Sequence, residues 1–216
     1  MKENRAEGTV IPAKKPVYEC FKRFFDILLA TIALIVTAPF ILIAALAIRL
    51  DSKGRAFYVS ERVTKDGKVF QMFKLRTMYL DADKRLKDLM EENEYKDAPA
   101  FKMKNDPRIT RVGRFLRKTS IDELPQLINV IAGQMSVVGP RPPLPDEVAR
   151  YTPYQRQRLG VKGGLTCYWQ SSGRNDIGFD EWVELDLKYI RERSLWTDFK
   201  IILKTFGAVF SMRGAM

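Results

Sequence analysis

The sequence predicts a mainly α-helical protein with one small β-hairpin, attached to a membrane. Three observations lead to this prediction: an uncharged apolar run near the N-terminus, several segments whose apolar residues recur at helical spacing, and two short β-like pieces around a turn. The chain has 216 residues, which allows one domain, or a small domain with a membrane anchor.

The apolar run extends from Ile27 to Ile48 and contains no charged residue. As a helix it would be about 33 Å long, enough to cross the hydrocarbon core of a bilayer. Pro39 lies near its middle, where it removes a backbone hydrogen bond and predicts a kink. Basic residues flank the run on both sides, which favours both ends in the cytoplasm. From these residues alone, a single transmembrane span and a hairpin that re-enters on one side both remain open. Asp26 would lie at headgroup depth.

We expect three regions along the chain: a flexible tail over residues 1–19, a membrane helix over residues 20–50, and a domain over residues 51–216. Within the domain, Asp66-Gly67 between two β-like pieces predicts a hairpin over residues 57–73. Helical patterns cover residues 80–97, 110–118, 121–132, 179–192 and 195–211, and an irregular loop is expected over residues 139–145. The last helix is amphipathic, so it could cover the core or lie in a membrane interface.

The composition excludes several kinds of active site. The chain has no histidine and only two cysteines, so it contains no Ser-His-Asp triad, no histidine-ligated zinc and no Cys₄ zinc site. Any chemistry must therefore use carboxylates, Lys or Arg, hydroxyls, or a hard metal held by oxygen. The net charge of +11 indicates a polyanionic partner, which could be nucleic acid, an acidic membrane surface or a phosphorylated small molecule.

The positive charge is concentrated in residues 101–118, where seven basic residues stand against Asp106 alone. Arg111, Arg114 and Lys118 have the spacing of one helix face. Such a stripe is either a solvated or lipid-facing surface or a cradle for phosphate, which guanidinium groups bind through paired hydrogen bonds.

This basic segment leads directly into Ser120-Ile121-Asp122-Glu123. The pattern has the form of a capping box, which predicts a helix start with two acidic residues in its first turn. The same residues also suit a site for a phosphate and a divalent metal. Asp122 could attack phosphorus while Glu123 holds Mg²⁺, and in a protein without histidine a carboxylate is one of few available nucleophiles.

Two further segments are weaker candidates for a binding site. The rigid loop Pro140-Arg141-Pro142 presents an arginine between proline rings, which could contact a base. A glycine-rich segment precedes Gln170 and is followed by Arg174, Asn175 and Asp176, a combination that could bind phosphate or ribose. Either segment could also be an ordinary turn.

Taken together, four segments closely resemble the bacterial sugar transferase family, the monotopic phosphoglycosyl transferases. They are FKRFFDILLATIALIVTAPF (21–40), FQMFKLRTM (70–78), FKMKNDPRITRVGRFLRKTSIDELPQLINVIAGQMSVVGPRP (101–142) and GGLTCYWQSSGRND (163–176). The resemblance covers roughly residues 20 to 212 and is most specific in the run from DELPQL to GPRP.

The resemblance implies a monotopic protein on the cytoplasmic face of the bacterial plasma membrane, with a re-entrant helix broken at Pro39 and interfacial amphipathic helices. It implies transfer of a sugar-1-phosphate from a UDP-sugar to polyprenyl (undecaprenyl) phosphate with release of UMP, initiating surface polysaccharide assembly. Mg²⁺ is the implied cofactor, and residues 51–216 become the catalytic domain.

The resemblance also assigns residue roles. Asp122 would be the nucleophile that forms an aspartyl phospho-sugar intermediate, and Glu123 would assist in binding the metal. The implied residues for the substrate phosphates and nucleotide are Lys74, Arg76, Arg111, Arg114, Arg117, Pro140, Arg141, Pro142, Gln170, Arg174, Asn175 and Asp176.

Two features bear on the partners. Residues 80–106 form a helical insert like that of hexose-type members, which implies UDP-glucose or UDP-galactose as the donor. Those larger members usually carry a further N-terminal membrane domain that this sequence does not show, which leaves a homo-oligomer open.

The resemblance implies no nucleic-acid partner. The competing reading is a membrane-anchored nucleic-acid-binding module, suggested by the charge of +11. A third reading is a plain membrane-spanning scaffold.

Overall fold

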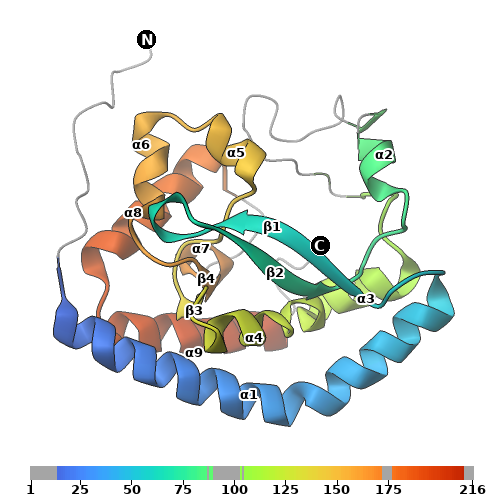
Figure 1. The fold of residues 1–216 in the computed structure, drawn as a ribbon, viewed down its shortest axis with the longest axis horizontal. Coiled ribbons are helices and arrows are strands. Elements are labelled where there is room, and N and C mark those ends of the chain that lie inside the picture. Colours follow the sequence, from blue (N-terminus) through green and yellow to red (C-terminus); the bar gives the residue numbers. More distant parts are fainter. Residues whose placement is uncertain (1–13, 87, 90–102, 104, 172–176, 212–216) are drawn as a thin grey trace.

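The protein is mainly helical with a small antiparallel hairpin, as the sequence predicts (Figure 1). This computed structural model describes residues 14–86, 88–89, 103, 105–171 and 177–211. The hairpin joins β1 (Phe57–Val63) to β2 (Val69–Leu75) in a register that pairs Phe57 with Leu75. Its turn contains Asp66 and Gly67, both with positive φ, as the Asp-Gly signal indicates.

The long N-terminal helix α1 (Pro16–Asp51) is one continuous element of 36 residues with Pro39 inside it. It begins at Pro16, earlier than the predicted start at residue 20. Figure 1 shows a bend near its middle, so that the helix curves around the rest of the molecule. Proline at position 39 has no N–H to donate to the carbonyl of Ile35, which explains the bend. The helix is long and apolar enough to cross a membrane.

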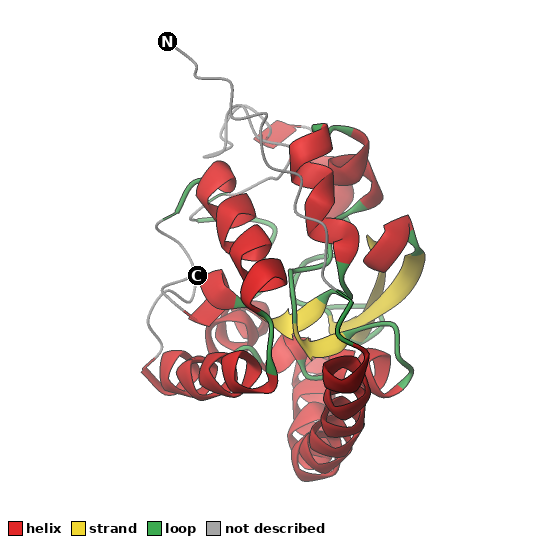
Figure 2. Ribbon diagram, turned by 90° about the vertical axis from the view of Figure 1, so that its left-hand side faces the viewer, coloured by secondary structure: helices red, strands yellow, loops and turns green. Residues whose placement is uncertain are grey.

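The two faces of α1 differ in chemistry. The face toward the domain buries small or polar residues such as Asp26, Ala30 and Ala44, together with Ile41 and Ile48. The opposite face exposes large apolar side chains, including Phe21, Phe24, Leu28, Ile32, Ile35, Phe40, Leu42, Ile43 and Leu46. Helix α9 (Leu195–Ser211) also exposes Trp196, Phe199, Leu203 and Phe206. Figures 1 and 2 place α1 and α9 along the same side of the molecule.

The remaining helices surround the hairpin. They are α2 (Ala82–Leu86), α3 (Arg111–Thr119), α4 (Gln126–Ile131), α5 (Pro145–Ala149), α6 (Pro153–Arg156), α7 (Tyr168–Ser171) and α8 (Phe179–Glu192). The two predicted C-terminal helices, 179–192 and 195–211, are confirmed. Of the predicted helix 80–97, the structure describes a helix over Ala82–Leu86, and residues 90–97 lie outside the described residues.

The predicted single helix over residues 121–132 is wrong. Residues Ile121–Glu123 form a 3₁₀ turn, and α4 begins only after Pro125. The structure also contains a second pair of strands, β3 (Ser136–Val138) and β4 (Gly164–Thr166), whose parallel pairing the sequence did not predict. Three-residue strands are too short to show an alternating pattern, and the partner strand is distant in sequence.

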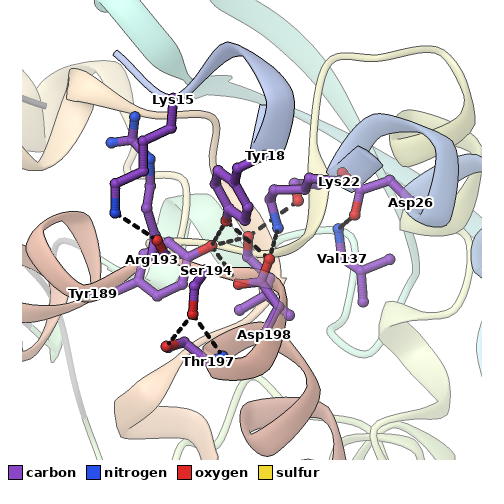
Figure 3. A network of polar contacts seen from close by, with 12 residues as sticks. Lys15, Tyr18, Lys22, Asp26, Val137, Tyr189, Arg193, Ser194, Thr197 and Asp198 are labelled. Carbon is purple, nitrogen blue, oxygen red and sulfur yellow. Dashed lines mark hydrogen bonds and ion pairs between the residues drawn. The ribbon is translucent and has the colours of Figure 1, made fainter. Parts of the chain in front are cut away.

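A buried carboxylate on α9 fastens the N-terminal half of α1 to the domain (Figure 3). Asp198 accepts hydrogen bonds from the Tyr18 hydroxyl at 2.9 Å, from the Lys22 ammonium at 2.8 Å and from the Tyr189 hydroxyl at 2.8 Å. The residue is 6% exposed, so water competes little for these bonds. Tyr18 and Lys22 lie on α1 and Tyr189 on α8, so one carboxylate joins three helices.

A second contact joins α1 to β3. The carboxylate of Asp26 accepts a hydrogen bond from the backbone N–H of Val137 at 2.9 Å, as Figure 3 shows, and Asp26 is buried. Asp26, which the sequence places at headgroup depth, thus packs against the domain. The Tyr189 hydroxyl also lies 3.0 Å from the carbonyl oxygen of Val138, so its one proton is shared between Asp198 and β3.

Candidate active site

Ser120, which has a left-handed backbone conformation, positions the two adjacent carboxylates. Helix α3 ends at Thr119, and Ser120 takes φ 59° and ψ 17°. The chain then turns back, and Asp122 and Glu123 follow in the 3₁₀ turn. The predicted capping box is therefore wrong, because its first residue has left-handed rather than extended backbone and its side chain makes no capping bond. A non-glycine residue in this region is uncommon and typical of sites where geometry is fixed by the surroundings.

Glu123 is held by two cations from different parts of the chain. Its Oε1 accepts from the Lys74 ammonium on β2 at 2.9 Å and from the Arg141 guanidinium at 3.4 Å. The hairpin, the 3₁₀ turn and the loop after β3 therefore meet here and bring together three of the predicted site residues, Lys74, Glu123 and Arg141.

Asp122 is buried, with 7% of its surface exposed. Burial raises the pKa of the Asp122 carboxyl to about 6, and the negative charge of Glu123 also raises it. Lys74, Arg117 and Arg141 oppose this shift, because their positive charges favour the ionised carboxylate. At neutral pH the group is an anion in a dry, cationic setting, the state required of a nucleophile.

The cations around the two carboxylates repel one another. Burial lowers the pKa of Lys74 and Arg117, and Arg141 lowers both further. Burial and Arg141 also lower the pKa of Arg62, to about 10. We call Lys74, Arg62, Arg117 and Arg141 the cationic pocket. Two further carboxylates act on these cations, since Glu147 raises the pKa of Arg62 and Asp106 raises that of Arg117. Around Asp122 itself, the charges are the three cations Lys74, Arg117 and Arg141 and the carboxylate of Glu123.

Close packing between α3 and the end of β2 positions the side chain of Arg117 in the pocket. Its Nε donates to the Thr77 hydroxyl at 2.9 Å. One turn earlier on α3, Gly113 allows the backbones to approach, since a Cβ there would lie 2.0 Å from the Thr77 carbonyl oxygen. The N–H of Thr110 donates to that same carbonyl at 3.0 Å. The helix thus carries Arg117 to the pocket only because position 113 has no side chain.

A second glycine contact supports the Pro140-Arg141-Pro142 loop. A Cβ on Gly164 would meet the N atom of Gly139 at 2.0 Å, so the backbones of β4 and of the loop after β3 touch. Arg62 donates to the carbonyl of Pro142 at 3.2 Å. Pro140 and Pro142 are buried and Arg141 is partly exposed, so the loop presents Arg141 to the carboxylates.

A small hollow lies between these groups. It is lined by Met72, Lys74, Glu123, Gln126, Arg141, Pro142, Gly164, Leu165 and Gln170. Gln170, a predicted site residue, is buried and accepts a hydrogen bond from the Cys167 thiol at 3.1 Å. Among the described residues, no three aspartate, glutamate or cysteine side chains gather into a cluster that could hold a metal ion.

Not every predicted site residue lies in this pocket. Arg76 donates to the carbonyls of Lys53 at 2.7 Å and Ser52 at 2.9 Å, so it anchors the chain after α1 instead. Arg111 and Arg114 are exposed on α3, and Arg111 borders an apolar groove against α1. Residues 174–176, which hold Arg174, Asn175 and Asp176, lie outside the described residues.

The structure adds residues that sequence reasoning missed. Gln126 lines the hollow, and its position three residues after Glu123 is the signal that could have identified it. Asn129 is fully buried on α4 and bonds β2, accepting from the Phe73 N–H at 3.0 Å and donating to the Gln71 carbonyl at 2.7 Å. It thereby fixes the strand that carries Lys74. Neither Asn129 nor Arg62 carries a sequence signal for this role.

Sequence comparison finds known proteins that are similar to this chain over most of its length. The sequence model described as "Bacterial sugar transferase" matches residues 17–212. The chain belongs to the bacterial sugar transferase family. It is 47% identical over 195 residues to a protein of Streptococcus agalactiae named galactosyl transferase CpsE, covering 90% of this chain and 43% of that protein.

Other members of the family are similar over nearly the same length. An undecaprenyl-phosphate galactose phosphotransferase of Salmonella typhimurium is 43% identical, over 90% of this chain and 41% of its own. The exopolysaccharide production protein ExoY of Rhizobium meliloti is 40% identical, over 94% of this chain and 91% of its own. The chain thus spans less than half of the first two relatives and nearly all of the third.

Proposed function

We propose that this chain transfers a sugar-1-phosphate from a UDP-sugar to polyprenyl phosphate, releases UMP and so initiates assembly of a surface polysaccharide. Its relatives carry names of this kind, among them galactose and glucose phosphotransferases acting on undecaprenyl phosphate. UDP-glucose and UDP-galactose are accordingly the proposed donors.

One observation carries the proposal: a buried carboxylate, Asp122, lies among three cations, Lys74, Arg117 and Arg141. Both proposed substrates carry negatively charged phosphate groups, and the pocket supplies positive charge next to the proposed nucleophile, Asp122. Fixed cations at a phosphoryl centre stabilise the charge that develops during transfer, the largest effect available to such an enzyme.

The proposed route has two displacements at one phosphorus. A carboxylate oxygen of Asp122 attacks the phosphorus that bears the sugar, the bond to the UMP oxygen breaks, and UMP leaves with the electron pair. A phosphate oxygen of the polyprenyl phosphate then attacks the same phosphorus, and the bond to Asp122 breaks to regenerate the carboxylate. Lys74, Arg117 and Arg141 would hold the phosphate oxygens in both steps.

Mg²⁺ is the proposed cofactor. Two adjacent carboxylates are too few to enclose the ion alone, but Mg²⁺ in phosphoryl-transfer sites is commonly held by one or two carboxylates and by the substrate phosphates. Asp122 and Glu123 meet that requirement, and Glu123 is the residue that would hold the ion while Asp122 reacts. When bound, the ion would supply further positive charge to the diphosphate.

The exposed apolar face of α1 supports the proposal that this reaction takes place at the membrane. Large side chains such as Phe21, Phe24 and Ile32 are exposed on α1. Trp196 and Phe199 are exposed on α9, a helix that lies along the same side of the molecule as α1 (Figures 1 and 2). We propose that α1 enters the cytoplasmic leaflet of the bacterial plasma membrane as a re-entrant helix bent at Pro39, while α9 lies in the interface.

The experiment is UMP release from UDP-glucose and UDP-galactose with undecaprenyl phosphate and Mg²⁺. The wild-type chain should release UMP and form a lipid-linked sugar with at least one donor. Asp122→Asn should abolish release and Glu123→Gln should reduce it strongly, while Glu61→Gln, an exposed carboxylate on β1, should leave it unchanged. If the wild type releases no UMP from any UDP-sugar, the proposal is wrong.

A further inference from the structure

An apolar groove runs between the second half of α1 and α3. Phe40, Ile43, Ala44 and Ala47 line it from α1, and Val112 and Phe115 line it from α3. Its volume is about 640 Å³, within the range of small-molecule sites.

Small residues on α1 create this groove. Ala44 and Ala47 leave space between the helices, while Phe40, Ile43 and Phe115 stand on its rim with 57%, 67% and 59% of their surfaces exposed. The floor is closed, because Ala44 packs into a core cluster with Leu116. The groove is thus a lasting feature of the packing of α1 on α3.

The groove ends at the residue that precedes the candidate nucleophile in the chain. At one end the carboxylate of Asp51 accepts from the N–H of Val112 at 3.2 Å, which places the end of α1 at the start of α3. The helices run antiparallel from there, so Ile121, which also lines the groove, lies at the other end. The residue after Ile121 is Asp122.

We propose that this groove holds the isoprenoid chain of the polyprenyl phosphate acceptor, with the phosphate end of the lipid at Ile121. The inference rests on the proposed function. A UDP-sugar would find few polar partners here, since only Asp51 and Arg111 among the lining residues are charged. A branched hydrocarbon chain would bury apolar surface along the whole groove. The groove also opens beside the exposed apolar face of α1, from which a membrane lipid would arrive.

The test fills the groove without touching the cationic pocket. In Ala47→Trp the indole occupies the space between the helices, whereas Leu46→Trp places the same side chain on the exposed face of α1, where Leu46 is 61% exposed. Two quantities are measured on the full chain: the burst of UMP from radiolabelled UDP-sugar without acceptor, and the KM for polyprenyl phosphates of increasing chain length.

We expect the wild-type KM to fall as the acceptor chain lengthens. Ala47→Trp should raise the KM for the long acceptor at least about tenfold and remove the dependence on chain length, since the contacts of several carbon atoms are lost. The UMP burst should stay unchanged, and Leu46→Trp should match the wild type in both measurements.

A second variant decides the matter if Ala47→Trp does not fold. Phe115→Ala removes an exposed rim side chain and should raise the acceptor KM about threefold or more, again with an unchanged burst. An unchanged KM in both variants, or an equal rise in Leu46→Trp, would overturn the inference and point to ordinary bilayer lipids in the groove. A loss of the UMP burst in a folded Ala47→Trp would overturn it also. Absence of any UMP in the wild type instead contradicts the proposed function.

Discussion

Ser120 has a backbone conformation that costs free energy for any residue with a Cβ. Its φ of 59° turns the chain between α3 and Asp122. Ser120→Gly should fold at least as stably as the wild type, whereas Ser120→Val should lose about 1–2 kcal/mol, because a β-branched side chain fits this region worst. Chemical denaturation in detergent measures both. Equal stability of the two variants would contradict the strained turn.

The ionisation of Asp122 gives a second prediction at the residue scale. Burial raises its pKa to about 6, so in metal-free protein the carboxyl should be largely protonated below about pH 5 and ionised above about pH 7. Lys74 lowers this pKa, so Lys74→Met should shift the titration to higher pH. The infrared band of the protonated carboxyl measures it, with Asp122→Asn to identify the band. A titration near the ordinary aspartate value, or a shift to lower pH in Lys74→Met, would refute the assignment.

At the scale of elements, the contact between α3 and the end of β2 depends on one missing side chain. A Cβ on Gly113 would lie 2.0 Å from the Thr77 carbonyl oxygen, so Gly113→Ala must push the helix away. We expect a loss of about 2–4 kcal/mol in the free energy of unfolding, with lower activity because Arg117 loses its bond to Thr77. Gly207→Ala is the matched control, since its Cβ would meet nothing within 4 Å and alanine favours helix. Similar stability of the two variants would contradict this account.

The bend of α1 is the second prediction at this scale. Pro39→Ala restores an N–H that can donate to the carbonyl of Ile35, so the helix should straighten. Single cysteines at position 10 and at position 61, which is exposed on β1, report the topology by labelling in sealed vesicles, in a background with Cys20 and Cys167 replaced by serine. Both should label on one face in the proposed wild-type topology, and a fraction of Pro39→Ala should label on opposite faces. Pro145→Ala, at the start of α5, should not change the pattern. Labels on opposite faces in the wild type would exclude the re-entrant helix.

At the scale of the whole molecule, sequence patterns predicted the elements whose structure depends on residues close together in the chain. The hairpin follows from Asp66-Gly67 between alternating residues, and α8 and α9 follow from helical spacing. Period-two alternation would also put Lys74 and Arg76 on one face, yet β2 ends at Leu75, and Arg76 turns to the carbonyls after α1. The left-handed backbone conformation of Ser120 could not be predicted for a similar reason. Its sequence matches a capping box, and only tertiary packing imposes the turn.

The attachment of α1 to the domain leads to a prediction at the scale of the molecule. Asp198 accepts from Tyr18, Lys22 and Tyr189, so Asp198→Asn leaves the Lys22 ammonium without its anionic partner in a largely buried place. We expect a loss of about 2–4 kcal/mol in stability, against less than about 0.5 kcal/mol for Asp180→Asn, an exposed aspartate on α8.

Hydrogen exchange distinguishes a local release of α1 from a general weakening. Since the bonds of Asp198 hold only the first turns of α1, exchange should accelerate over residues 16–26 and stay slow over residues 41–51, which pack in a separate cluster with Leu75 and Leu116. Release of that half should also loosen β3, because the Tyr189 hydroxyl lies within hydrogen-bond distance of both Asp198 and the carbonyl of Val138, one residue before the loop that presents Arg141. The donor KM of Asp198→Asn should then rise. Uniform acceleration of hydrogen exchange along α1, or an unchanged donor KM, would show that the hydrogen bonds of Asp198 hold the helix but do not affect the cationic pocket.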